Sequence, residues 1–119
     1  MKRPLASLWF VVGLAAVFFA GCHALPPSKP LDQLTPTEMQ GYAVFQSNCA
    51  RCHYANNTWS LHGPGLQALY KQPYLPSGAP ANDDRVSAVI QHGRAMMPSF
   101  GNTLDDRQMQ ELLAYLHTL

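Results

Sequence analysis

Apolar residues follow a helical period near the end of the chain. Four of them recur at positions i, i+3, i+4 and i+7, namely Met109, Leu112, Leu113 and Leu116. This spacing lines one face of an α-helix. Asp105 and Gln108 precede the stripe with the three-residue separation of a capping box, in which each side chain bonds the backbone of the other residue. The pattern predicts an amphipathic helix that begins after Asp105 and buries its apolar face.

A second helix is predicted from Pro36 to about Ala50. Thr35 is a favourable N-cap, Pro36 suits the first helical position, and Glu38 completes another capping box. Gly41 lies in the middle of this helix, where glycine is less stable than alanine. We therefore expect Gly41 to have a packing role, such as permitting a close helix crossing.

The middle of the chain holds a long loop and one short helix. Residues 54–81 contain seven glycines and prolines, so we predict mostly loop, with a helical turn near residues 66–70. So long a loop in a small domain is expected where it packs on a cofactor. Asn82 is the predicted N-cap of a helix that stops at Gly93. No segment has the pattern of a strand, so the predicted fold class is all-α, without a sheet.

The run C-A-R-C-H at residues 49–53 is typical of covalent haem attachment. The thiols of Cys49 and Cys52, on one helical turn, can each add to a vinyl group, and His53 can ligate the iron through Nε2. Two other interpretations exist. A redox dithiol would require a βαβ context, which the surrounding pattern lacks. A zinc site would require two more ligands at close spacing, and only His62 is near.

A second axial ligand is expected, because an electron carrier gains from an iron that is saturated and reorganises little on redox change. Met97 is the predicted ligand, since it lies in an irregular segment where Pro98 disfavours helix. Met96 is the competing candidate. Met109 lies on the apolar stripe and is expected to be core filler.

The first 21 residues have the layout of a bacterial export signal. Lys2 and Arg3 precede an uncharged apolar run over residues 5–20. The run closes on F-A-G-C, which resembles the lipobox of bacterial lipoproteins, where the signal is cut before a cysteine that then carries lipid. We predict a signal peptide over residues 1–21, cleaved before a lipidated Cys22. An uncleaved signal anchor and simple secretion are the alternatives, and all three place the domain outside the cytoplasm, on the periplasmic side of a membrane.

The composition agrees with one small exported domain. Of the 3 cysteines, one is assigned to lipid and two to haem, which leaves no thiol over. Residues 22–34 are rich in proline, so we predict a tether that lets the domain stand about 35–40 Å from its membrane, at roughly 3 Å per residue. The domain then covers residues 35–119. Without the signal, six basic residues face seven acidic ones, and this balance argues against nucleic-acid binding.

Four motifs, in order, resemble the small class I cytochromes c. They are the first helix with its haem-attachment run, G-P-G-L at residues 63–66, V-I-x-x-G-R-x-x-M-P-S-F-G at residues 89–101, and the last helix from residue 104. Together they cover about residues 36–119, nearly all of the predicted domain. The resemblance implies three to four helices wrapped around one covalently bound haem c.

The resemblance also implies roles for single residues. The carbonyl of Pro64 would accept a hydrogen bond from Nδ1 of His53, and Met97 would be the second axial ligand. The crossing of the first and last helices would be formed by Gly41, Phe45 and Tyr115. The side chains that could reach a haem propionate are Arg94, Trp59 and Tyr70. Among the remaining histidines, His62 and His92 are expected at the surface, with propionate contact or iron ligation as the alternative, whereas His23 and His117 show no functional signal.

The sequence therefore predicts a carrier of single electrons and not an enzyme. Its partners would be redox proteins that donate and accept electrons transiently, and a membrane reached through the lipid anchor; no nucleic acid or small-molecule substrate is expected. One alternative is a dedicated electron-accepting subunit of a periplasmic dehydrogenase or oxidase. The other is a haem peroxidase or gas-binding protein, in which Met97 would not ligate the iron.

Overall fold

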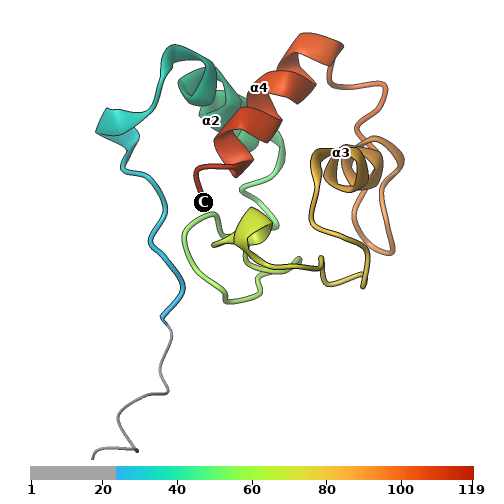
Figure 1. The fold of residues 1–119 in the computed structure, drawn as a ribbon. Helices are drawn as coiled ribbons and strands as arrows, with labels where there is room; N and C mark the ends of the chain where they lie inside the picture. Colours follow the sequence, from blue (N-terminus) through green and yellow to red (C-terminus); the bar gives the residue numbers. More distant parts are fainter. Residues whose placement is uncertain (1–23) are drawn as a thin grey trace, which may run out of the picture.

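The computed structural model describes residues 24–119, so the predicted signal peptide and Cys22 lie outside the described part. Five helical elements follow one another: η2 (Leu31–Gln33), α2 (Pro36–Asn48), η3 (Leu69–Lys71), α3 (Asp83–His92) and α4 (Asp106–Leu116). In this part of the chain, strand-like pairing is limited to two isolated bridges. The all-α prediction is therefore confirmed, with three α-helices (Figure 1). No helix within residues 24–119 has the length and apolar character needed to cross a bilayer.

Both predicted capping boxes are present. At the start of α2, the Thr35 amide donates to the Glu38 carboxylate over 2.7 Å, and the Glu38 amide donates to the Thr35 hydroxyl. At the start of α4, the Gln108 amide donates to the Asp105 carboxylate over 2.7 Å, and the reciprocal bond is also made. Asn82 caps α3, as predicted. Each bond satisfies an amide that the first helical turn leaves unpaired.

Helices α2 and α4 cross with their backbones in close contact at Gly41 (Figure 1). A Cβ at Gly41 would lie 2.8 Å from the Cβ of Tyr115 and closer still to the Glu111 carbonyl. The rings of Phe45 and Tyr115 pack with their centroids 5.5 Å apart, and Tyr42 meets Tyr115 edge-on at the same distance. The predicted packing role of Gly41 is confirmed, because the crossing leaves no room for a larger side chain.

The core is built mainly from the apolar stripe of α4. Its buried side chains are Met109, Leu112, Leu113, Tyr115 and Leu116. Helix α3 adds Val86 and Ile90, and α2 adds Phe45. The assignment of Met109 to the core is confirmed, since its side chain is 5% exposed.

The helical turn expected near residues 66–70 lies slightly later, as η3 at Leu69–Lys71. Ala68 explains the shift. Its backbone is left-handed (φ 57°) and its side chain is fully buried. A left-handed residue cannot continue a right-handed helix, so the turn begins only after it.

Residues 26–34, which the sequence predicts to be part of a proline-rich tether, lie on the domain, and we call them the strap. The Lys29 amide donates to the Thr118 carbonyl over 2.7 Å. The Gln67 side chain donates to the Pro26 carbonyl over 3.2 Å. Leu34 packs against the hydrophobic core. The folded unit therefore begins before residue 35, because contacts distant in sequence hold the proline-rich segment in place.

Candidate functional site

The predicted attachment run lies at the C-terminal end of α2. Cys49 is the C-cap residue, and its carbonyl accepts from the amides of Cys52 at 2.9 Å and of His53 at 3.0 Å. These bonds hold residues 49–53 in one tight turn. Both thiols are free. Within the described residues, no group of three or more His, Cys, Asp or Glu side chains could hold a metal ion by itself.

The His53 ring is held by the backbone of the loop at residues 63–65. Its Nδ1 lies 2.8 Å from the carbonyl oxygen of Pro64. Because a carbonyl oxygen can only accept, Nδ1 must carry a hydrogen, and in the neutral imidazole Nε2 is then the nitrogen with the free lone pair. His53 therefore has the tautomer and the fixed orientation that an iron-ligating histidine requires.

Glycine allows this loop to approach the imidazole. A Cβ at Gly63 would lie 2.9 Å from each ring nitrogen of His53 and nearer still to the carbon between them. The Gly63 amide donates to the Cys52 carbonyl over 2.8 Å, which ties the loop back to the attachment turn. Sequence reasoning did not give Gly63 this contact with the ring. The available signal was the glycine on either side of Pro64.

The protonation state of Cys49 argues against a redox dithiol. Burial of Cys49, together with its neighbour Cys52, raises the pKa of the Cys49 thiol to about 11. At neutral pH this thiol is therefore protonated. The attacking cysteine of a dithiol pair needs a lowered pKa, because the thiolate is the nucleophile.

The segment that contains Met97 is a tight turn after α3. The Arg94 amide donates to the Met97 carbonyl over 3.1 Å, and the Met97 amide donates to the Arg94 carbonyl over 2.9 Å. Gly93, with φ 72°, and Ala95, with φ 51°, supply the left-handed backbone of the turn. These backbone bonds thus fix the position of the Met97 main chain.

The two neighbouring methionines differ in burial. Met96 is 87% exposed, whereas Met97 is half-buried and packs against the hydrophobic core. A thioether has no strong hydrogen-bonding requirement, so apolar contacts are sufficient to position it. Of the two methionine side chains, that of Met97 is the one that packs against the interior of the domain.

Other candidate residues lie at the surface. The Arg94 side chain is exposed, and Trp59 is 76% exposed. His62, in the loop after the attachment turn, and His92, in the last turn of α3, are exposed as expected. None of these four side chains makes a hydrogen bond or ion pair to another side chain in residues 24–119.

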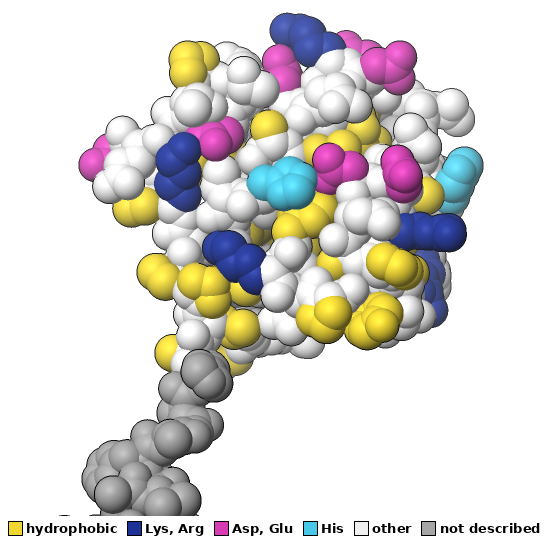
Figure 2. Space-filling model, in the orientation of Figure 1, with side chains coloured by type: hydrophobic (Ala, Val, Ile, Leu, Met, Phe, Trp, Pro, Cys, Tyr) yellow, Lys and Arg dark blue, Asp and Glu magenta, His cyan; other side chains and the backbone are white. Residues whose placement is uncertain are grey.

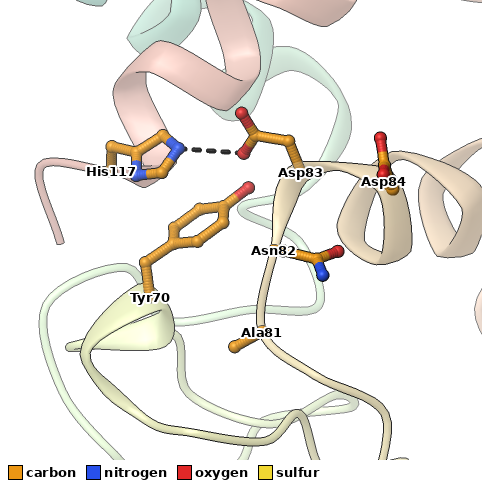
Figure 3. A pocket seen from close by; sticks show the side chains of 6 residues that line it. All are labelled: Tyr70, Ala81, Asn82, Asp83, Asp84 and His117. Atoms are coloured by element: carbon orange, nitrogen blue, oxygen red, sulfur yellow. Dashed lines mark hydrogen bonds and ion pairs between the residues drawn. The ribbon is translucent and has the colours of Figure 1, made fainter.

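Tyr70, Asp83 and His117 form a polar cluster that sequence reasoning missed (Figure 3). His117 Nε2 lies 2.9 Å from the Asp83 carboxylate, and its ring stacks on that of Tyr70 with centroids 3.7 Å apart. The cluster joins η3, the start of α3 and the end of α4, and it lines an open pocket of about 510 Å³. His117 therefore links segments of the fold, although its sequence position gave no sign of it.

Charge in this cluster is concentrated on Asp83. The Tyr70 hydroxyl oxygen is buried and makes no hydrogen bond of standard geometry among the described residues. The nearby Tyr70 hydroxyl, and to a smaller extent His117, hold the pKa of the Asp83 carboxyl below its usual range. Burial, and then the Asp83 carboxylate, raise the pKa of the Tyr70 phenol. At neutral pH, Asp83 is ionised and Tyr70 is neutral.

The donor set at the end of α2 fits a covalently attached haem. Cys49 and Cys52 offer two free thiols on one turn, and His53 offers an oriented Nε2 lone pair. Met97 offers a thioether from a separate turn. These are the groups needed for two thioether links and for nitrogen and sulfur ligation of a haem iron.

Comparison with known proteins gives the family. The family model described as "Cytochrome C oxidase, cbb3-type, subunit III" matches residues 36–116. This range includes the attachment turn, the loop at residues 63–65 and the turn with Met97. The chain belongs to the monohaem class I c-type cytochromes.

Relatives of this cytochrome include several cytochromes c6. That of Thermosynechococcus vestitus is 31% identical in an alignment of 91 residues that covers 72% of this chain and 78% of the relative. That of Pyropia yezoensis is 28% identical over 121 residues, covering 98% of this chain and 93% of the relative. A solved structure of cytochrome c6 from the diatom Phaeodactylum tricornutum is 27% identical, with a TM-score of 0.48, and covers 66% of this chain and 88% of that one.

Family membership determines the cofactor and the type of activity. This cytochrome carries one covalently bound haem c, as its sequence predicts. It is an electron carrier and not an enzyme. The resemblance to class I cytochromes c is thus confirmed.

Proposed function

We propose that Cys49 and Cys52 hold the haem, that His53 and Met97 ligate its iron, and that the protein carries single electrons between redox proteins. The observation that carries this proposal is the 2.8 Å contact between His53 Nδ1 and the Pro64 carbonyl oxygen. It leaves Nε2 as the ring nitrogen with a free lone pair. Bound haem supplies an iron that cycles between Fe(II) and Fe(III).

Met97 would be the second protein ligand of the haem iron, through its sulfur. Its packing against the core, in contrast to the exposure of Met96, supports this choice. An iron held by both His53 and Met97 would leave no site for a small ligand, so this ligation would disfavour a peroxidase or a gas-binding protein. Methionine stabilises Fe(II) better than a second imidazole does, so we expect a positive midpoint potential. A clearly negative midpoint would instead indicate a second histidine, such as His62 or His92.

Replacement of each methionine in turn tests the ligand. Met97→Ala should give a high-spin or histidine-ligated haem that binds carbon monoxide readily, because the sixth position opens. Met96→Ala is the matched control and should have a nearly native spectrum, because its side chain is 87% exposed. Optical and magnetic spectra of the purified oxidised and reduced proteins distinguish the two variants. The opposite pattern would contradict ligation by Met97.

The proposed place of action is the periplasmic side of a bacterial membrane, with Cys22 as the lipid-bearing residue. Support comes from the charged start, the uncharged run over residues 5–20 and the A-G pair directly before the cysteine. Cys22→Ser should abolish labelling by a radioactive fatty acid and leave a larger, unprocessed precursor. A wild-type protein without fatty-acid label would contradict the lipid anchor at Cys22. An unlabelled protein that keeps its full N-terminus would support an uncleaved signal anchor instead.

A second candidate function is that of an electron-entry subunit within one oxidase. The observation that favours it is the match over residues 36–116 to a family that is named after a subunit of a cytochrome c oxidase. Purification from native membranes under mild detergent separates the candidates. Recovery in fixed proportion with oxidase subunits would support the subunit, whereas recovery alone would support a carrier that docks transiently on several partners.

A further inference from the structure

The strap is attached to the domain at both ends. At its start, the Pro26 carbonyl accepts from the Gln67 side chain over 3.2 Å. At its other end, Leu34 packs against the hydrophobic core directly before the N-cap of α2. Between them, the Ser28 hydroxyl oxygen is buried and has no hydrogen-bond partner among the described residues. A free tether would expose such a polar group to water.

Lys29 is the central contact of the strap. Its amide donates to the Thr118 carbonyl over 2.7 Å, and its ammonium group lies 2.7 Å from the Glu38 carboxylate. The same Glu38 carboxylate caps α2 through the Thr35 amide. Lys29 therefore joins the segment directly after α4 to the first turn of α2. The strap and the two crossed helices thus form one packed unit.

The attachment point at Pro26 limits how far the domain can lie from position 22. Fully extended chain spans at most about 3.6 Å per residue, so the Cα atoms of Cys22 and Pro26 are separated by no more than about 14 Å. A tether that was free up to residue 35 would instead allow about 35–40 Å at roughly 3 Å per residue. Docking of the strap removes most of this reach.

The domain surface beside this attachment point includes the strap and Gln67, and the strap contacts the end of the chain at Thr118, which is buried like Leu119. The exposed Lys71 lies next to this buried chain end, because its ammonium group donates to the Leu119 carbonyl over 3.0 Å. In Figure 1 the strap runs along the side of the domain, and the described chain leaves at the lower edge. Hydrophobic side chains gather along that edge (Figure 2).

We propose that the strap holds the domain directly against the bilayer that carries the anchor, with the surface around Pro26, Gln67 and Lys71 facing the lipid headgroups. This proposal rests on the proposed lipidation of Cys22. This surface would contact the bilayer itself, because the chain between the lipid on Cys22 and Pro26 is too short to hold the surface away from the membrane. Electron partners of the anchored protein must then present their redox centres close to the same membrane surface.

Hydrogen exchange tests the docking of the strap without involving the membrane. In the haem-loaded full chain in detergent, the Lys29 amide should exchange more slowly than an unprotected amide by roughly tenfold or more. Lys29→Pro removes the donor amide and should release the strap, whereas Lys29→Arg keeps both the amide and the positive charge and should retain it. Unprotected exchange of the Lys29 amide in the wild-type protein would contradict docking of the strap. The proposed lipid anchor and the proposed electron-carrier function would not be affected by that result.

Energy transfer tests the distance from the bilayer. The acylated, haem-loaded protein is bound to vesicles that contain a headgroup-labelled fluorescent lipid, and the haem quenches the label. Insertion of about ten Gly and Ser residues between Leu25 and Pro26 lengthens the tether and should reduce the quenching several-fold, while Lys29 stays protected. Equal quenching by the wild type and the insertion variant would overturn the membrane-facing surface. Absence of acyl label on the wild-type protein would contradict both the lipid anchor and the membrane-facing surface. Slow exchange of the Lys29 amide would still show, in that case, that the strap is docked on the domain.

Discussion

The two sides of the candidate site are built in different ways. On one side, a ring nitrogen of His53 contacts the Pro64 carbonyl at 2.8 Å, and the backbone of Gly63 packs against the ring. On the other side, Met97 is held through its backbone by paired bonds to Arg94, and its side chain packs against the hydrophobic core. The first arrangement fixes the direction of the side chain itself. The second fixes only the point from which the side chain starts.

This difference follows from the chemistry of the two side chains. An imidazole has two nitrogens, so it needs a partner on one of them to present the other. A thioether is weakly polar and flexible, so packing alone can place it. We therefore expect the His53 side to tolerate little change and the Met97 side to adjust.

The strongest test of this comparison is Gly63→Ala. Its Cβ would lie within 2.9 Å of both ring nitrogens of His53, so the ring or the loop must move. We expect a loss of about 2–4 kcal/mol in the free energy of unfolding, together with altered histidine ligation. Chemical denaturation and the spectrum of the haem-loaded protein measure both. Pro64→Ala is the control, because it keeps the carbonyl oxygen, and it should be nearly native. A native haem spectrum in Gly63→Ala would contradict the claim that the loop at residues 63–65 holds the His53 ring rigidly.

The next test is Gly93→Ala, on the methionine side. Gly93 has φ 72°, and an added Cβ would lie 2.6 Å from the Met97 carbonyl oxygen. Gly78 has φ 81° with nothing within 4 Å of an added Cβ, so Gly78→Ala is a control for backbone strain alone. Both variants should lose about 1–2 kcal/mol of stability from the left-handed backbone. Only Gly93→Ala should also weaken the iron–methionine band in the visible spectrum. Equal spectra in the two variants would mean that the turn does not position Met97.

The smallest expected effect is that of Asp83→Asn, at the opposite end of α3 from the turn with Met97. Weakening of the contact with His117 should lower the free energy of unfolding by about 0.5–1 kcal/mol, a small effect because both side chains are half exposed. Thermal denaturation measures this loss, and the haem spectrum should not change. A change in the spectrum would show that the cluster controls the methionine side.

The pH dependence of the same variant has a definite sign. The pKa of Asp83 is lower in the folded protein than its usual value, so the folded state binds fewer protons than the unfolded state as this group titrates. Its contribution is complete above the usual carboxyl pKa and is lost as pH falls through the folded pKa. The difference in stability between wild type and Asp83→Asn should therefore shrink on acidification. A difference that grows on acidification would contradict the lowered pKa.

Local features were predicted well from the sequence. The caps at Thr35, Asn82 and Asp105 involve residues three positions apart, and all three are present. The close crossing at Gly41 was also anticipated, because a glycine inside a helix needs a packing reason. The contact between His53 and Pro64 was expected only from the family resemblance, since an eleven-residue separation has no signature of its own.

Features that depend on distant contacts were missed. His117 lies 34 residues from Asp83, and Gln67 lies 41 residues from Pro26. No local pattern marks either pair, so His117 showed no functional signal and the strap was predicted only as part of a proline-rich tether. The left-handed Ala68 was missed as well, because alanine favours helix and only its burial in this fold makes the strained backbone acceptable.

The sequence by itself determined the all-α class, the helix starts and the attachment run, because each depends on spacings within one or two helical turns. Only the tertiary structure decided the tautomer of His53, the burial of Met97 relative to Met96, and the docking of the strap. Each of these depends on which backbone carbonyl or apolar surface the fold brings next to a side chain. Such proximity results from the packing of the whole chain, so residue types and their order do not contain it in readable form.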